Sequence, residues 1–99
     1  MVKKVPPMHP GEVLREEFLA PLALSELARI CGVPRTRMER IANEETGITA
    51  DTALRLSKAF GTTAQMWLNL QNSYDVRVAT QEIGKELAGI ERIAPNKAA

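Results

Sequence analysis

SELARICGVPRTRMERIAN, residues 25–43, is the stretch of sequence that decides the fold. It predicts two short helices joined by a tight turn at Gly32, the second helix running over about residues 34–43. In that second helix Met38 and Ile41 recur at helical spacing, so we expect both to face inward. Two helices joined in this way can place the second one in the major groove of DNA.

The outward positions of the second helix carry the side chains that we expect to touch DNA, namely Arg35, Thr36, Arg37 and Arg40. Arginine can donate two hydrogen bonds at once to guanine, and the first turn of such a helix lies closest to the base edges. Arg35 and Thr36 fall in that first turn, Arg40 lies about a turn further on, and Arg37 can reach a base or a phosphate. Three arginines on one helix are also typical of a surface that faces only solvent. The sequence on either side of the helix must therefore distinguish a solvated surface from a DNA-binding one.

The composition limits the classes of protein that fit. The chain has 99 residues, enough for one compact domain, and a net charge of +1, so a DNA reader must gather its positive charge on one face. The one cysteine, Cys31, excludes an internal disulfide and a multi-cysteine metal site and indicates a reducing compartment. No apolar run is long enough to span a membrane and residues 1–10 lack a signal-peptide core, so we expect a cytoplasmic protein.

Helical spacing of apolar residues recurs on both sides of the quoted stretch. It predicts further helices at residues 11–20, 50–60 and 64–76, and it extends the first helix of the quoted stretch back to residue 22, so that this helix covers residues 22–31. Pro21 should end the first of them. Thr49 should cap the fourth helix, Gly61 should stop it, and Thr62 or Thr63 should cap the fifth. His9, the only histidine, is expected to cap or precede the first helix.

The predicted fold is therefore all-α, with a helical domain over residues 11–78. Before it, residues 1–10 contain three prolines and predict an extended arm. After it, residues 79–99 predict a partly helical extension with a frayed end, because Gly84 and Gly89 weaken its apolar stripe. A short helix in this extension is expected to pack on the domain or on a second subunit.

Trp67, Leu70 and Tyr74 share one face of the fifth helix. Two interpretations of this face stay open. It can be buried in the core of one protomer, or it can form a pairing surface between two protomers, where amphipathic aromatic residues are enriched.

The sequence contains no recognisable catalytic motif. It has no glycine-rich phosphate loop, no paired carboxylates in a pocket and no Ser/His/Asp arrangement, and His9 has no second histidine or cysteine near it. We therefore expect no enzymatic activity, no metal and no cofactor.

The segments HPGEVLREEFLAPL, LARICGVPRTRMERIAN and GITADTALRLSKAFGTTAQMWLNLQ together resemble the HigA (also called VapI) antitoxins of the Xre, or lambda-repressor-like, helix–turn–helix family. The resemblance runs over residues 9–74. It implies a five-helix DNA-binding domain that acts as a homodimer, represses its own operon at a palindromic operator, and neutralises a HigB-like ribonuclease toxin. The resemblance implies, by position, that Arg35, Thr36 and Arg40 contact the DNA bases, with Arg37 beside them. It also implies that two protomers pair through residues 67–74.

Three segments depart from the family pattern. The Ser/Thr-Gln pair that grips phosphate at the start of the second helix is replaced by Ala23 and Leu24, and Ser25 lies two residues late. Either Ser25 caps a shorter helix or that grip is missing. Pro34 stands where Ser or Thr often caps the recognition helix, and Glu44 with Glu45 would repel a phosphate, so DNA binding is expected to be weaker or differently oriented.

Two alternatives remain beside the antitoxin interpretation. One is a solitary Xre-type transcriptional regulator without a toxin partner. The other is a protein-interaction module that has lost DNA binding through the shortened second helix and the two acidic residues.

Overall fold

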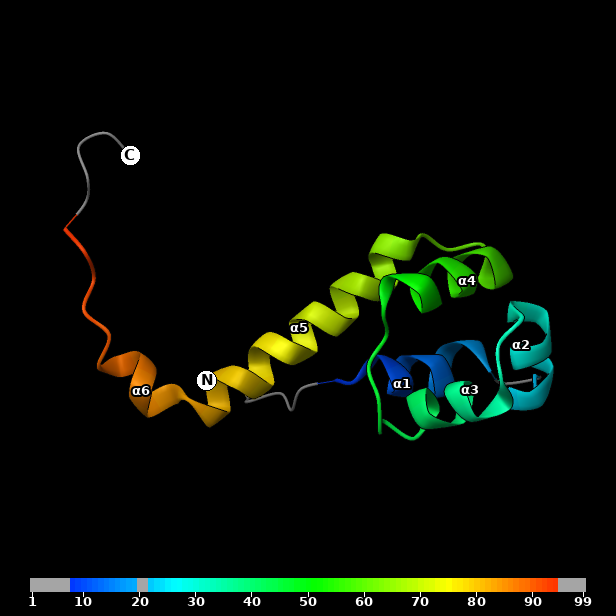
Figure 1. The fold of residues 1–99 in the computed structure, drawn as a ribbon, viewed down its shortest axis with the longest axis horizontal. Helices are drawn as coiled ribbons and strands as arrows, with labels where there is room; N and C mark the ends of the chain where they lie inside the picture. Colours follow the sequence, from blue (N-terminus) through cyan, green and yellow to red (C-terminus); the bar gives the residue numbers. More distant parts are fainter. Residues whose placement is uncertain (1–7, 20–21, 95–99) are drawn as a thin grey trace.

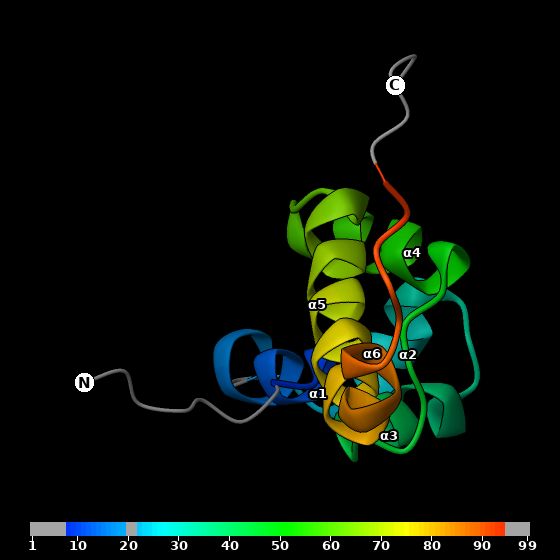
Figure 2. The ribbon, with the colours of Figure 1, turned by 90° about the vertical axis from the view of Figure 1, so that its left-hand side faces the viewer.

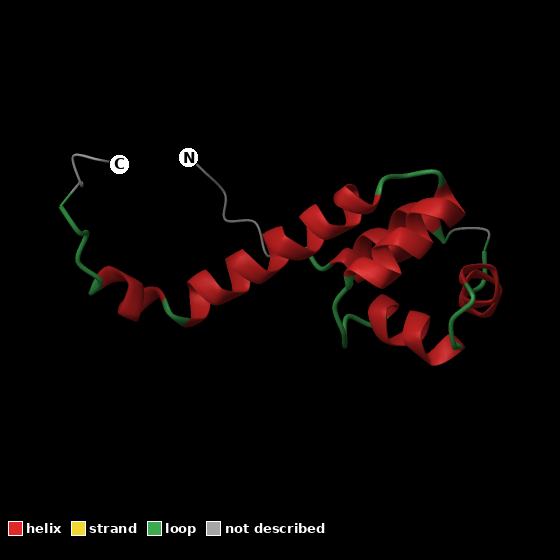
Figure 3. Cartoon of the chain, turned by 45° about the horizontal axis from the view of Figure 1, so that its top comes forward, coloured by secondary structure: helices red, strands yellow, loops and turns green. Residues whose placement is uncertain are grey.

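The computed structural model describes residues 8–19 and 22–94, and all regular structure within them is helical, which confirms the all-α prediction (Figure 1, Figure 3). In chain order the elements are α1 (Pro10–Val13), its π-helical continuation η1 (Leu14–Phe18), α2 (Leu24–Cys31), α3 (Arg35–Ala42), α4 (Ala50–Phe60), α5 (Ala64–Glu82) and α6 (Gly84–Ala88).

Most helix ends lie where the sequence predicts them. The hydroxyl of Thr49 accepts a hydrogen bond from the Thr52 amide at the start of α4, and the hydroxyl of Thr63 caps α5. Gly32 and Gly61 end α2 and α4 with φ angles of 72° and 71°, in the left-handed region that favours glycine. The first helix ends at Phe18, two residues before the predicted end of its span at residue 20, and Pro21 itself lies outside the described residues.

His9 is the N-cap of α1, as predicted. Its Nδ1 accepts a hydrogen bond from the Gly11 amide at 2.9 Å, and its ring meets that of Tyr74 edge-on with centroids 4.8 Å apart. The side chain is only 3% exposed, and this burial lowers the pKa of His9 below its ordinary value of 6.5. A neutral imidazole is therefore favoured, which keeps Nδ1 available as an acceptor.

The core lies between α1, α2, α3, α4 and the first half of α5, which together form the helical body. Its largest fully buried side chains include Trp67, Leu14, Leu27, Met38, Ile41 and Leu56.

Trp67 decides between the two interpretations of its own position. The family resemblance placed it on the pairing surface with Leu70 and Tyr74, but Trp67 is 0% exposed within one protomer. Its indole N–H donates to the Thr62 hydroxyl at 2.8 Å and its ring packs beside Phe18, with centroids 5.1 Å apart. A side chain with no exposed area has none to offer a second protomer, so Trp67 is a core residue.

The second half of α5 leaves the helical body and carries α6 at its end (Figure 1), so that α6 lies in front of the other helices when the molecule is viewed from that end (Figure 2). α5 crosses residues 78 and 79 without a break, and the predicted domain boundary there stays a prediction. The short helix in the extension forms, but residues 79–94 are exposed throughout. Packing of this helix on its own domain was therefore a wrong expectation for the described residues.

The contact between α1 and α3 generates a stability prediction. A Cβ on Gly11 would overlap the carbonyl oxygen of Ile41, whereas a Cβ on Gly84 would meet no atom within 4 Å. We expect Gly11→Ala to lower the free energy of unfolding by about 1–3 kcal/mol through overpacking. The matched variant Gly84→Ala should raise it slightly, by roughly 0.4–1 kcal/mol. Urea unfolding followed by circular dichroism measures both, and equal effects would contradict the close packing of α1 on α3.

Candidate nucleic-acid interface

The turn between α2 and α3 lies at Gly32, where the sequence predicts it. Pro34 is the N-cap of α3 with an extended backbone (φ −63°, ψ 146°) and forms no side-chain capping bond. On either side of it, Val33 packs against the core and Met38 is fully buried. These apolar residues stand at the two positions of a hydrophobic staple, which fixes how the chain enters α3.

The outer face of α3 carries all four residues predicted for DNA contact. Arg35, Thr36, Arg37 and Arg40 are exposed, whereas Met38, Ile41 and Ala42 are buried. The eight residues of α3 therefore divide into a basic outer face and an apolar inner face.

The three arginines of α3 differ in their partners. Arg35 Nε lies 2.7 Å from Glu39 Oε2 one turn further along the same helix. Arg37 Nη1 lies 3.0 Å from Asp51 Oδ1 on α4. Arg40 pairs with no carboxylate in residues 8–19 and 22–94. Helical spacing in the sequence indicates their common face and is compatible with the Arg35–Glu39 pair, but it does not indicate the pair between Arg37 and Asp51, which lie on different helices.

Ser25 does not cap α2. The N-cap is Ala23, which offers no side-chain acceptor, and Ser25 is the exposed second residue of the helix. The capping alternative for Ser25 is therefore wrong. The first amides of a helix have no partner within it and lie at its positive end, so this turn can still meet a phosphate through its backbone.

Arg15 supports the far end of α3, a role that the sequence analysis did not find. Its Nη1 donates to the carbonyl oxygen of Ala42, in the last turn of α3, and lies 3.1 Å from Glu44 Oε2. Glu44 has a positive φ of 63°, unusual for a residue with a side chain. The Glu44 carboxylate pairs with Arg15, so of the two acidic residues in this loop Glu45 is the one without an ion pair to the described residues.

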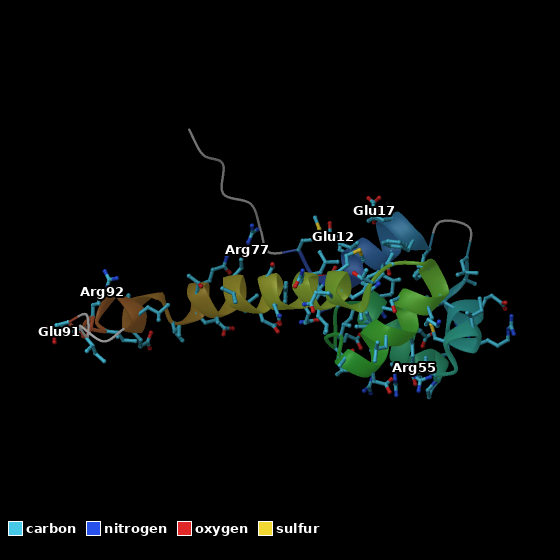
Figure 4. The ribbon with its side chains drawn as sticks, turned by 90° about the horizontal axis from the view of Figure 1, so that it is seen from above. Glu12, Glu17, Arg55, Arg77, Glu91 and Arg92 are labelled. Carbon is cyan, nitrogen blue, oxygen red and sulfur yellow. The ribbon has the colours of Figure 1, made fainter. Side chains whose placement is uncertain are left out.

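Arg55 supports the other end of the helix–turn–helix. Its Nη1 donates to the carbonyl oxygens of Cys31 at 2.7 Å and Gly32 at 3.4 Å, and its Nε donates to Asp51 Oδ1 at 2.7 Å. Figure 4 places Arg55 on the side of the helical body opposite Glu12 and Glu17. The hydrogen bond from Arg55, followed by that from Arg37, lowers the pKa of Asp51, so the carboxylate stays charged.

Nucleophilic catalysis by the cysteine, metal binding and membrane insertion have little support in the described residues. Burial raises the pKa of the Cys31 thiol, so it stays protonated and is a poor nucleophile. Residues 8–19 and 22–94 bring together no group of three or more His, Cys, Asp or Glu suited to a metal ion. Among the helices described, none has the length and apolar character needed to cross a membrane.

Comparison with known proteins gives a consistent set of relatives. Virulence-associated protein I of Dichelobacter nodosus is 51% identical over 81 residues, which span 80% of this chain and 75% of that protein. Pseudomonas aeruginosa antitoxin HigA, solved with the higBA promoter, superposes with a TM-score of 0.86 at 41% identity, covering 89% of this chain and 99% of that one. Antitoxin GraA in complex with its operator superposes with a TM-score of 0.86 at 40% identity, covering 96% and 99%. No protein-family model matches the chain.

The Arg15 contact generates a second stability prediction. Arg15→Met keeps the aliphatic stem but removes the donor to the Ala42 carbonyl. We expect the free energy of unfolding to fall by about 1 kcal/mol, the lower part of the usual range because Arg15 is 39% exposed and water can replace the donor. Arg29→Met is the matched control. Within the described part of the chain Arg29 pairs with Glu26 alone, on the surface of α2, so this variant should leave stability unchanged. Chemical unfolding in which both variants behave alike would contradict the role of Arg15.

Proposed function

Because the chain belongs to the HigA/VapI family of Xre-type helix–turn–helix antitoxins, we propose that it represses its own operon as a homodimer and neutralises a HigB-like ribonuclease toxin. Members of this family include proteins solved with operator or promoter DNA, and the chain is accordingly a DNA-binding antitoxin. It acts by binding, without a catalytic step or cofactor, and we place it in the cytoplasm with its operator.

The basic outer face of α3 is the observation that carries the DNA proposal. Arg35 and Thr36 lie in the first turn, where a recognition helix approaches the bases. The Arg35–Glu39 pair does not block this use, because an exposed ion pair contributes only about 0–1 kcal/mol whereas a bidentate contact to guanine contributes about 1–3 kcal/mol. Glu39 can then accept a bond from cytosine or hold the arginine in place.

Arg40 and Ser25 extend this face toward the DNA backbone. Arg40 is exposed and carries no ion pair with the described residues, so its charge is available to a base or a phosphate. Ser25 lies in the first turn of α2, where the amides and the hydroxyl can meet a phosphate oxygen.

For the homodimer we propose the α5 face that contains Leu70 and Tyr74. Both residues are half-buried in one protomer, and they line a shallow groove together with Met8, Ser73 and Arg77. Pairing through this face would set two α3 helices apart by about one DNA turn, roughly 34–36 Å, and so require a palindromic site.

The test of the DNA proposal is fluorescence anisotropy with labelled DNA from upstream of the chain's own gene. Arg35→Ala/Arg40→Ala should weaken operator binding by at least about 30-fold, the equivalent of roughly 2 kcal/mol for two lost base contacts. Binding should also weaken with added salt, and saturation should occur at two protomers per palindrome.

The matched control is Lys85→Ala/Arg92→Ala. It removes the same charge from the exposed end of the chain, where Figure 4 shows Arg92 far from the helical body. It should leave operator binding nearly unchanged. Equal losses in the two double variants would reduce the effect to net charge, and no selective binding by the parent protein would favour an interaction module without DNA binding.

The toxin proposal is tested by identifying the gene next to this one and expressing the protein that it encodes. Expressed alone, that protein should arrest growth, and co-expression with this chain should restore growth and yield a complex that co-elutes in size-exclusion chromatography. A harmless neighbour that never co-elutes would instead support the solitary regulator.

A further inference from the structure

One carboxylate joins the recognition helix to the rest of the helix–turn–helix. Asp51 Oδ1 on α4 accepts from Arg37 Nη1 on α3 and from Arg55 Nε on α4. Arg55 also holds the last carbonyl groups of α2 and of the turn that follows it. We call Arg37, Asp51 and Arg55 the Asp51 network.

The two arginines in this network are held differently. Arg55 has three acceptors, two of them backbone carbonyl oxygens, so its guanidinium is fixed to the turn. Arg37 donates to Asp51 alone among the described residues and is 41% exposed. A guanidinium has five N–H donors, so Arg37 keeps donors for a further acceptor while one of its nitrogens is held.

The Asp51 network borders an open groove between α3 and α4, of about 490 Å³, lined by Arg37, Ile41, Thr46, Gly47, Thr49, Asp51 and Thr52. A negative charge in such a place works against DNA affinity, because it repels the phosphate backbone. If the groove served only to attract DNA, a neutral residue at position 51 would serve better. The carboxylate therefore has to contribute something other than affinity.

We propose that Asp51 is a positioning residue for DNA reading, which holds Arg37 against α4 and so restricts it to one contact on the operator. The inference rests on the proposed DNA-binding function. Restricting an arginine lowers its ability to contact any nearby phosphate and raises the difference between the correct and the wrong DNA. Asp51 thus contributes selectivity at the expense of general affinity.

A purely structural role for Asp51 has to be separated from this one. Asp51 lies in the first turn of α4, where an acidic residue favours the positive end of the helix. That role predicts a loss of stability when the carboxylate is removed, with no change in the preference for one DNA sequence over another.

Asp51→Asn tests the proposal, with Glu17→Gln as the control that removes one carboxylate from the opposite side of the helical body (Figure 4). Each protein is titrated with the operator and with a scrambled duplex of equal length at three salt concentrations. Asp51→Asn should bind the scrambled duplex several-fold more tightly and reduce the operator-to-scrambled affinity ratio by about three- to fivefold, the most that releasing one exposed ion pair accounts for. Glu17→Gln should leave the ratio unchanged.

Arg37→Ala and the double variant Asp51→Asn/Arg37→Ala complete a double-mutant cycle. Because Asp51 acts through Arg37, Asp51→Asn should not alter the ratio once Arg37 is absent. An altered ratio in that background would overturn the proposal, as would an unchanged ratio in Asp51→Asn alone, whatever happens to stability. A parent protein with a ratio near one would overturn the proposed function itself, and this inference with it.

Discussion

The burial of Met38 and Ile41, on the inner face of α3, is the interaction on which the rest of the structure depends. α3 has eight residues, starts at a proline without a capping side chain, and carries three arginines on its outer face. A helix of that length is not stable by itself in water, since isolated helices shorter than about 12–15 residues are marginal. Its shape must therefore come from its neighbours.

Those neighbours hold α3 at both ends. At its C-terminal end Arg15 donates to the Ala42 carbonyl, and Gly11 lets α1 approach the Ile41 carbonyl without a side chain between them. Ahead of its N-terminal end Arg55 holds the carbonyl groups of Cys31 and Gly32. Arg15 and Arg55, which lie outside α3, thus stabilise the chain at the two ends of α3. The arginines on α3 itself are exposed and can contact a ligand.

The helices and the outer face of α3 could be predicted from the sequence, because capping residues, glycines and apolar spacing act within a few positions along the chain. Thr49 and Gly61 are examples, and both lie where they were predicted. The contacts of Arg15 and Arg55 span 27 and 24 positions, a separation at which no local pattern indicates a partner. Trp67 shows the same limit, since spacing places it on a face but does not say whether its own protomer or a second one covers that face.

Packing also connects the proposed pairing face to α3. Tyr74 contacts the ring of His9, His9 caps α1 through the Gly11 amide, and Gly11 lies against the end of α3. These contacts leave little room for adjustment, because His9 is buried and Gly11 admits no side chain. A protomer pair formed through Tyr74 would therefore hold its two α3 helices at a nearly fixed separation. Rigid spacing of this kind lets half-site distance, in addition to base contacts, distinguish an operator from other DNA.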